Sequence, residues 1–225
     1  MNIIHFKKIK STNLYARENL EKLNLPVIIF AETQTGGMGR MGRVFHSPEG
    51  GLYMTYVDRF EAPLISMIVP LGITEALIKR GVEAGILWPN DIILKGKKLG
   101  GILIERVEGV YLIGIGINCN ATREDFPVDL RERITTLKEE TGRKWNITEL
   151  GIEIIENILL FIHRQEYIHS LYTERMYGIG KEYRVETGGR VIKGVIKGVT
   201  KEGHLILETP EETLTLPSAT LWRVA

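Results

Sequence analysis

The sequence has one cysteine, no long hydrophobic run and almost no excess of either charge. Cys119 cannot form a disulfide within the chain, which is typical of proteins from a reducing cytosol. No stretch approaches the roughly 20 apolar residues of a membrane-spanning helix, and the apolar run near the start is too short for a signal peptide. The 29 Lys and Arg residues against 28 Asp and Glu argue against a general nucleic-acid coat. We therefore expect a cytoplasmic protein with no membrane partner and no DNA partner.

Several signatures of common enzyme classes are also missing. The five histidines do not have the spacing of metal ligands, and the cysteine lies near none of them; they are His5, His46, His163, His169 and His204. Neither the phosphate-binding pattern G-x-x-x-x-G-K-[ST] nor the nucleophile pattern G-x-S-x-G occurs. The sequence thus does not favour a histidine metal centre, a P-loop or a serine hydrolase.

The 225 residues suffice for one large domain and a small one. Periodicity and turn residues predict strands over 2–8, 27–32, 52–57 and 110–117, helices over 13–23, 65–81 and 147–165, and a hairpin of 86–94 and 99–105 around the turn 95–98. Short apolar runs over 182–186, 191–199, 204–208 and 213–216 then predict a small β-barrel. We expect a catalytic domain over 1–177 and a barrel over 178–225.

A glycine-rich segment runs from Thr33 to Gly51. It contains Gly37-x-Gly39-x-x-Gly42, a literal match to the dinucleotide-binding fingerprint, but a proline and a strand follow where that fingerprint needs a helix. We therefore reject a Rossmann fold. A strand–loop–strand connection of this length is usually functional, and Arg40 and Arg43 add fixed positive charge. The segment predicts a loop that wraps an anion; a merely flexible loop is the alternative.

Two further segments could carry chemistry. Asp91 begins a predicted strand, and Lys97 and Lys98 lie on the opposing turn, an arrangement that can organise a metal-bound triphosphate. An ordinary hairpin with a solvated turn remains the alternative. Gly114 and Gly116 weaken a strand unless a ligand or a neighbouring backbone approaches closely, and packing against a helix would explain them equally well.

Taken together, these segments resemble the biotin protein ligases. The matching pieces are Ser11-Thr12-Asn13, 31–35, Gly39-Arg40-x-Gly42-Arg43, 47–53, Trp88-Pro89-Asn90-Asp91, 98–101, 114–118 and 136–142. They occur in the family's order and cover nearly the whole chain. The resemblance implies an α/β fold of the α+β type: a mixed, largely antiparallel sheet backed by helices, with a small C-terminal SH3-like β-barrel.

The resemblance also implies a reaction. Biotin and MgATP would form biotinyl-5′-AMP, and a lysine of a biotin carboxyl carrier domain would then accept the biotin. The implied biotin-binding residues are Ser11, Thr12, Asn13, Gln34, Gly39, Arg40, Tyr53, Lys98, Gly101, Gly114 and Gly116. Arg40, Arg43, Asn118 and Arg223 would bind ATP, and Arg40, Lys98 and Asp91 would be catalytic. Asp91 would also bind Mg²⁺.

Two positions depart from the family pattern. Met38 stands where an arginine is expected, and Leu87 where a lysine is expected, so two cations are missing from the implied phosphate environment. A protein that binds biotin or biotinyl-AMP but turns over poorly is therefore an alternative, as is a lipoate or octanoate ligase. A nucleic-acid module in the barrel has little support from its charges. The chain begins at the implied catalytic domain, so no DNA-binding domain is expected; a homodimer remains open.

Overall fold

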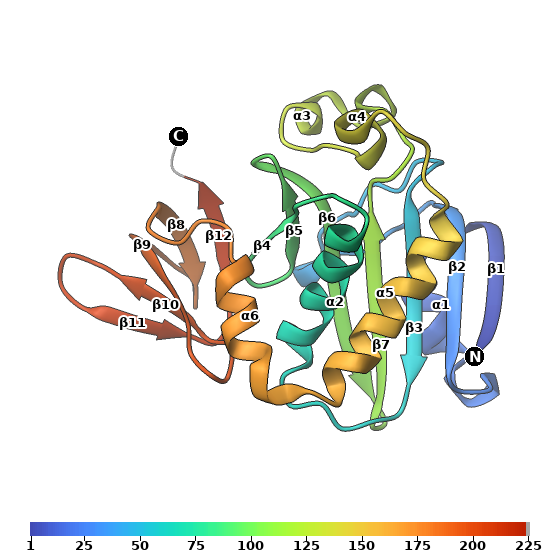
Figure 1. The fold of residues 1–225 in the computed structure, drawn as a ribbon, viewed down its shortest axis with the longest axis horizontal. Helices are drawn as coiled ribbons and strands as arrows, with labels where there is room; N and C mark the ends of the chain where they lie inside the picture. The colour runs from blue at the N-terminus through green and yellow to red at the C-terminus, as the bar shows by residue number, and fades with distance from the viewer. Residues whose placement is uncertain (224–225) are drawn as a thin grey trace. The chain divides into compact units, whose positions relative to one another are not determined.

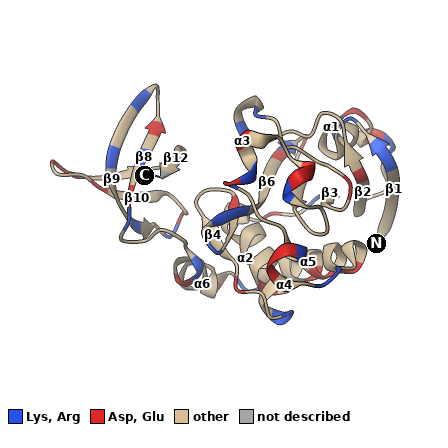
Figure 2. Cartoon of the chain, turned by 90° about the horizontal axis from the view of Figure 1, so that it is seen from above, with Lys and Arg blue, Asp and Glu red and all other residues tan. Residues whose placement is uncertain are grey.

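The computed structural model describes residues 1–223. The chain divides into two compact units. The first comprises Met1–Ala62 and Leu94–Glu156; the second comprises Pro63–Ile93 and the chain from Asn157 onward. Figure 2 shows basic and acidic segments interleaved along the chain in both units, and the net charge is +1. No helix among the described residues is long and apolar enough to cross a membrane.

The first unit is built on a mixed sheet. Five strands lie in the hydrogen-bonded order β1 (Asn2–Ile9), β2 (Val27–Gln34), β3 (Leu52–Asp58), β7 (Val110–Ile117) and β6 (Lys97–Val107) (Figure 1). β1 and β2 are parallel, whereas β2–β3, β3–β7 and β7–β6 are antiparallel. A parallel pair needs a crossover, which α1 (Thr12–Glu18) provides. The expected mixed, largely antiparallel sheet is confirmed.

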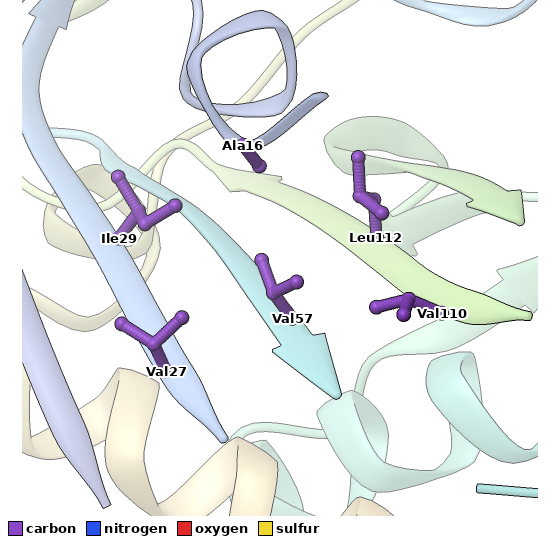
Figure 3. Close-up of a cluster of buried hydrophobic side chains, with 6 residues drawn as sticks. All are labelled: Ala16, Val27, Ile29, Val57, Val110 and Leu112. Carbon is purple, nitrogen blue, oxygen red and sulfur yellow. The ribbon is translucent and has the colours of Figure 1, made fainter. Parts of the chain in front are cut away.

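Helices cover both faces of this sheet. Alternate residues of the strands contact α1, where Figure 3 shows one apolar cluster: Ala16, Val27, Ile29, Val57, Val110 and Leu112. The opposite face of β2 meets the start of α5 (Ile147–Ile162), because a Cβ added to Gly151 would lie 2.7 Å from Phe30. Burial on both sides explains why β2 reads as a continuous apolar run rather than an alternating one.

The second unit combines helices with a separate antiparallel sheet. α2 (Ile65–Lys79) packs against α5, where a Cβ on Gly72 would lie 2.5 Å from Ile158, and against α6 (Ile168–Arg175) through the 2.6 Å ion pair of Arg175 and Glu75. The strands of the small sheet follow the order β11 (Thr213–Leu216), β10 (Leu205–Glu208), β9 (Arg190–Val199), β8 (Glu182–Thr187) and β12 (Thr220–Arg223). β11 and β12 are thus its two edges.

Short helices complete the chain. They are the 3-10 helices Leu20–Lys22, Arg40–Gly42, Arg123–Asp125 and Gln165–Tyr167 and the α-helices α3 (Val128–Arg131) and α4 (Leu137–Thr141). The sequence did not predict α3, α4 or α6. The predicted helix over 13–23 is in fact α1 followed by a 3-10 turn, with Asn19 between them.

The predicted hairpin of 86–94 and 99–105 is wrong in detail. Residues 86–94 form two strands, β4 (Gly85–Leu87) and β5 (Asp91–Leu94), which pair with each other across Trp88-Pro89-Asn90. The turn before β6 is only Lys95-Gly96, both with positive φ, as a two-residue hairpin turn requires. Lys97 and Lys98 therefore lie in β6 rather than in the turn.

Candidate active site

The sheet face under α1 changes character along its length. It is apolar beneath Ala16, where Val57 and Leu112 lie. Two residues further along the strands, Thr55 of β3 pairs with Gly114 of β7. Two residues beyond Gly114, Gly116 pairs with Tyr53 of β3 on one side and with Gly101 of β6 on the other. Gly101, Gly114 and Gly116 present no side chains, and we call them the glycine platform.

The turn between β1 and α1 places polar groups above this platform. Ser11 is the N-cap of α1, and its Oγ accepts a 3.4 Å hydrogen bond from the amide of Leu14. The Thr12 amide and hydroxyl both donate to Gln34 Oε1, at 2.8 and 3.2 Å. Ser11, Thr12 and Asn13 are all buried. The predicted residues at 11–13 and Gln34 of β2 are therefore brought together.

Thr55 lies at the centre of this group, although the sequence did not indicate it. Its hydroxyl lies 2.6 Å from Asn13 Oδ1 and 2.8 Å from Thr12 Oγ1, so its single proton is donated to one of them at a time. Asn13 Nδ2 donates to Glu105 Oε2 at 3.1 Å, and the other oxygen of Glu105 pairs with Arg17. We call Ser11, Thr12, Asn13, Gln34 and Thr55 the polar cluster.

Two side chains cover the glycine platform. A Cβ added to Gly114 would collide with Asn13 Oδ1, so Asn13 lies directly over that glycine. A Cβ on Gly116 would lie 2.5 Å from Phe45 Cε1, and one on Gly101 would lie 3.3 Å from Phe45 Cε2 and 3.5 Å from Lys98 Nζ. Only glycine fits beneath Asn13 and Phe45. Close approach by neighbouring groups therefore explains these glycines.

The glycine-rich loop folds back on itself. Two isolated antiparallel bridges join its two sides, Gln34 with Ser47 and Met38 with Val44. Beyond the second bridge, toward the tip of the loop, the Gly39 amide donates to the carbonyl of Arg43 at 2.7 Å. A 3-10 turn stands where a dinucleotide fold needs an α-helix, so the rejection of a Rossmann fold is confirmed. Arg40 begins this turn and Arg43 follows it.

Tyr53 connects the loop to the sheet. Its hydroxyl donates a 2.7 Å hydrogen bond to the carbonyl of Pro48, and its ring meets that of Phe45 edge to face at 6.3 Å. Burial raises the pKa of the Tyr53 phenol well above its usual value, so the phenol stays protonated and remains a donor. Tyr53 thereby contacts the loop at both Phe45 and Pro48.

Asn118 and Lys98 lie together at the ends of β7 and β6. The Asn118 amide donates to the carbonyl of Leu99, and Lys98 pairs with Ile134 in an isolated bridge. Asn118 Nδ2 donates to the carbonyl of Thr135 at 3.1 Å. Its Oδ1 is buried without a hydrogen-bond partner. A buried acceptor of this kind suits a ligand that brings a donor.

The remaining predicted residues belong to the second unit. Asp91 begins β5, as expected from the sequence, and pairs in register with Leu87. Arg223 ends β12, but its side chain lies outside the described part of the chain. Within residues 1–223, no three His, Cys, Asp or Glu side chains form a group that could hold a metal ion.

Known proteins resemble this chain over most of its length. Residues 4–121 match the model of the biotin/lipoate A/B protein ligase family. The bifunctional ligase/repressor BirA of Bacillus subtilis is 36% identical over 97% of this chain and 73% of its own length. The biotin–[acetyl-CoA-carboxylase] ligase of Paracoccus denitrificans is 26% identical, with 93% and 95% covered. A structure of the Aquifex aeolicus biotin protein ligase in complex with biotin and ATP superposes with a TM-score of 0.87, at 29% identity over 99% of both chains.

The chain therefore belongs to the biotin/lipoate A/B protein ligase family. Residues 178–220 match a second model, the biotin protein ligase C terminal domain. Within the family, the chain thus falls among the biotin protein ligases, and the resemblance seen in the sequence is confirmed.

Proposed function

We propose that the chain is an ATP-dependent biotin ligase that makes biotinyl-5′-AMP and transfers the biotin to a lysine of a biotin carboxyl carrier domain. The polar cluster beside the glycine platform is the observation that carries this proposal. Relatives and a solved neighbour that are named for biotin support it.

The polar cluster suits the ureido group of biotin. That group has one carbonyl acceptor and two N–H donors, and the cluster offers hydroxyls that both donate and accept, together with an amide. Ser11, Thr12 and Gln34 would bind it, while Asn13 and Thr55 hold them in place. A lipoyl or octanoyl chain has no such polar end. It would leave buried polar groups unpaired at about 1–3 kcal/mol each, which disfavours a lipoate ligase.

In the first step, a carboxylate oxygen of biotin attacks the α-phosphorus of ATP, and the bond to the β-phosphate breaks to release pyrophosphate. Both reactants are anions, so the site must supply positive charge and N–H donors. We assign this to Gly39 and Arg40 of the loop, to Arg43 and to Lys98. Holding the two reactants in line recovers a large part of the entropic barrier.

In the second step, the amine of the acceptor lysine attacks the acyl carbon of biotinyl-AMP. The amine loses a proton, and AMP leaves with the electrons of the acyl–oxygen bond. We assign Lys98 to the acyl oxygen and Asp91 to the approaching lysine. Tyr53, Gly101, Gly114 and Gly116 would form the floor on which biotin lies during both steps.

The nucleotide would meet Asn118, whose unpartnered Oδ1 can accept a hydrogen bond from it, and Arg223. Mg²⁺ usually binds through one or two carboxylates with the phosphates and water. Asp91 alone fits that pattern, and the described residues hold no larger group that would cage the ion. When bound, the ion would neutralise charge on the triphosphate.

We further propose a catalytic domain of 1–177 and an SH3-like domain of 178–225, of which 224 and 225 lie outside the described residues. The match of 178–220 to the family's C-terminal model supports this division. A cytoplasmic location suits the single cysteine, which is buried as a free thiol. A cytoplasmic location also suits the proposed acceptor of biotin, the carrier domain of a metabolic carboxylase.

Pyrophosphate release from purified protein with MgATP tests the function. We expect release that depends on biotin and not on lipoate, followed by transfer to a carrier lysine. Gln34→Ala should raise the KM for biotin about tenfold or more, because it removes the acceptor of the Thr12 amide. Gln165→Ala, which changes the other glutamine of the chain, is the matched control. Pyrophosphate release with lipoate but not with biotin would refute the proposal.

A biotin-binding protein with weak turnover is the second candidate, favoured by Met38 and Leu87. Met38→Arg and Leu87→Lys restore the two missing cations. If this candidate is right, the pair of changes should raise kcat roughly ten- to a hundredfold, the worth of a charged hydrogen bond. An unchanged kcat in an active protein would rule this candidate out.

A further inference from the structure

The ring of Phe45 rests directly on the glycine platform. A Cβ on Gly116 would lie 2.5 and 2.6 Å from Phe45 Cε1 and Cζ, and one on Gly101 would lie 3.3 Å from Cε2. These two glycines pair with each other across β6 and β7. The ring is therefore in van der Waals contact with the backbone of both β6 and β7 at these glycines. A ligand that lies on the same two glycines cannot be there at the same time.

Phe45 is held in this position by two hydrogen bonds to its backbone and one contact to its ring. The Phe45 amide donates to the carbonyl of Gly37 at 2.8 Å, which closes the loop behind it. Ser47 Oγ donates to the Phe45 carbonyl at 3.1 Å. The ring of Tyr53 meets it edge to face. Phe45 is thus a fixed part of this conformation rather than a residue at a free loop tip.

A hydrogen-bond chain links Phe45 to the polar cluster. Gln34 Nε2 donates to Ser47 Oγ at 3.0 Å, and Ser47 Oγ donates in turn to the Phe45 carbonyl. The other end of the Gln34 side chain accepts from Thr12. A ligand that takes over hydrogen bonds of Gln34 therefore competes with the contact that holds Phe45 in place.

We propose that Phe45 is a built-in competitor for the biotin ring: it occupies the Gly101–Gly116 half of the glycine platform in the free protein, and it must leave before biotin can bind there. The inference rests on the proposed function, since it assigns the platform to biotin. Only the fraction of molecules with the ring displaced accepts ligand, so the apparent association rate constant is reduced by that fraction. The hydrogen-bond chain makes Gln34 the residue through which a bound ureido group favours the displaced state.

Biotin association with the full chain tests the proposal, measured by rapid filtration with radiolabelled biotin. A displaced state populated at 10% or less predicts that Phe45→Ala speeds association about tenfold or more. Phe45→Leu, which keeps a smaller apolar side chain, should give an intermediate rate. Val44→Ala is the matched control, because the neighbouring Val44 is 70% exposed and should leave association unchanged.

The rate of dissociation separates this role from a simpler one. If Phe45 only covered bound biotin, Phe45→Ala would speed dissociation and leave association unchanged or slower, and the proposal would be overturned. Binding of biotin by the wild type confirms the ligand on which the argument rests. If neither the wild type nor any variant binds biotin, the proposed function fails first and the role of Phe45 fails with it.

Discussion

At the scale of single residues, the hydroxyl of Thr55 connects two residues of the polar cluster. It is fully buried and lies within hydrogen-bond distance of both Thr12 and Asn13. Neither acceptor can reach water if that hydroxyl is removed. The geometry of the polar cluster therefore depends on a residue that need not touch the ligand.

Thr55→Val should lower the free energy of unfolding by about 1–3 kcal/mol, because it keeps the side-chain shape but leaves buried acceptors unpaired. It should also raise the KM for biotin more than the KM for ATP. Denaturant unfolding and initial rates measure the two effects. Thr74→Val is the matched control: this hydroxyl is equally buried, in α2 of the second unit, and bonds to the carbonyls of Pro70 and Leu71. If Thr55→Val shifted the KM for biotin and the KM for ATP equally, the polar cluster would not be specific to biotin, which contradicts its proposed role.

Sequence reasoning could identify Ser11, Thr12, Asn13 and Gln34 because they form family motifs, and the structure brings all four together. It missed Thr55, Ser47 and Glu105. Thr55 did leave a signal, as the polar residue within the buried run of β3. Glu105 left none, since an acidic residue near the end of a strand is ordinary. The role of Glu105 appears only in the fold, where β6 brings the Glu105 carboxylate to Asn13 and Arg17.

At the scale of elements, the short helix α4 has an unusual place. Thr136 is its N-cap, with Oγ1 accepting a 3.2 Å hydrogen bond from the Glu139 amide. The residue on either side is tied to the site: the Thr135 amide donates to the carbonyl of Lys98, and the Leu137 amide to that of Asn118. The start of α4 thus holds the ends of β6 and β7 at fixed positions.

We expect Thr136→Ala to cost about 0.5–2 kcal/mol of stability, the usual value of an N-cap. Because Lys98 and Asn118 lose their support, the KM for ATP should rise. Thr122→Ala serves as the control, since Thr122 caps the neighbouring 3-10 helix at Arg123–Asp125. Thermal unfolding and ATP titrations measure both. A rise in the KM for ATP of equal size in the two variants would show that the position of α4 does not matter.

Strands and helices were predicted correctly where the apolar run or the helical periodicity extends over many residues. The strands at 27–32, 52–57 and 110–117 and the helices at 65–81 and 147–165 are confirmed as β2, β3, β7, α2 and α5. The failures have physical causes. The buried side of α6 depends on contacts with α2, such as the Arg175–Glu75 pair, that the sequence does not display. Pro89 and Asn90 divide β4 from β5, where a continuous strand was expected.

At the scale of the whole molecule, several acidic protons are held by burial. Burial raises the pKa of the Cys119 thiol to about 12, and it raises the pKa values of the Tyr53, Tyr56 and Tyr172 phenols; at Tyr56 a hydrogen bond to Asp58 adds to the effect. The folded chain therefore keeps protons that the unfolded chain loses above about pH 9. In that range the unfolded state binds fewer protons, so stability falls as pH rises.

We therefore expect full stability below about pH 9 and a loss that grows as the pH approaches 12. Urea unfolding midpoints at about pH 7.5 and about pH 10.5 measure the effect. Cys119→Ala removes one of these groups and should make the decline shallower. A midpoint that does not change between the two pH values would contradict the burial of these groups.

The strand order has a consequence for the synthesis of the protein. β7 lies between β3 and β6, although both β6 and β7 follow β3 in the chain. A nascent chain that has just exposed Asp58 carries the whole polar cluster but lacks the glycine platform, which is complete only when Gly116 has emerged. At roughly 5–20 residues per second, the ribosome needs several more seconds to supply it. During that interval the polar residues at 11–13 have no floor beneath them, and the growing chain lacks the surface on which we propose that biotin lies.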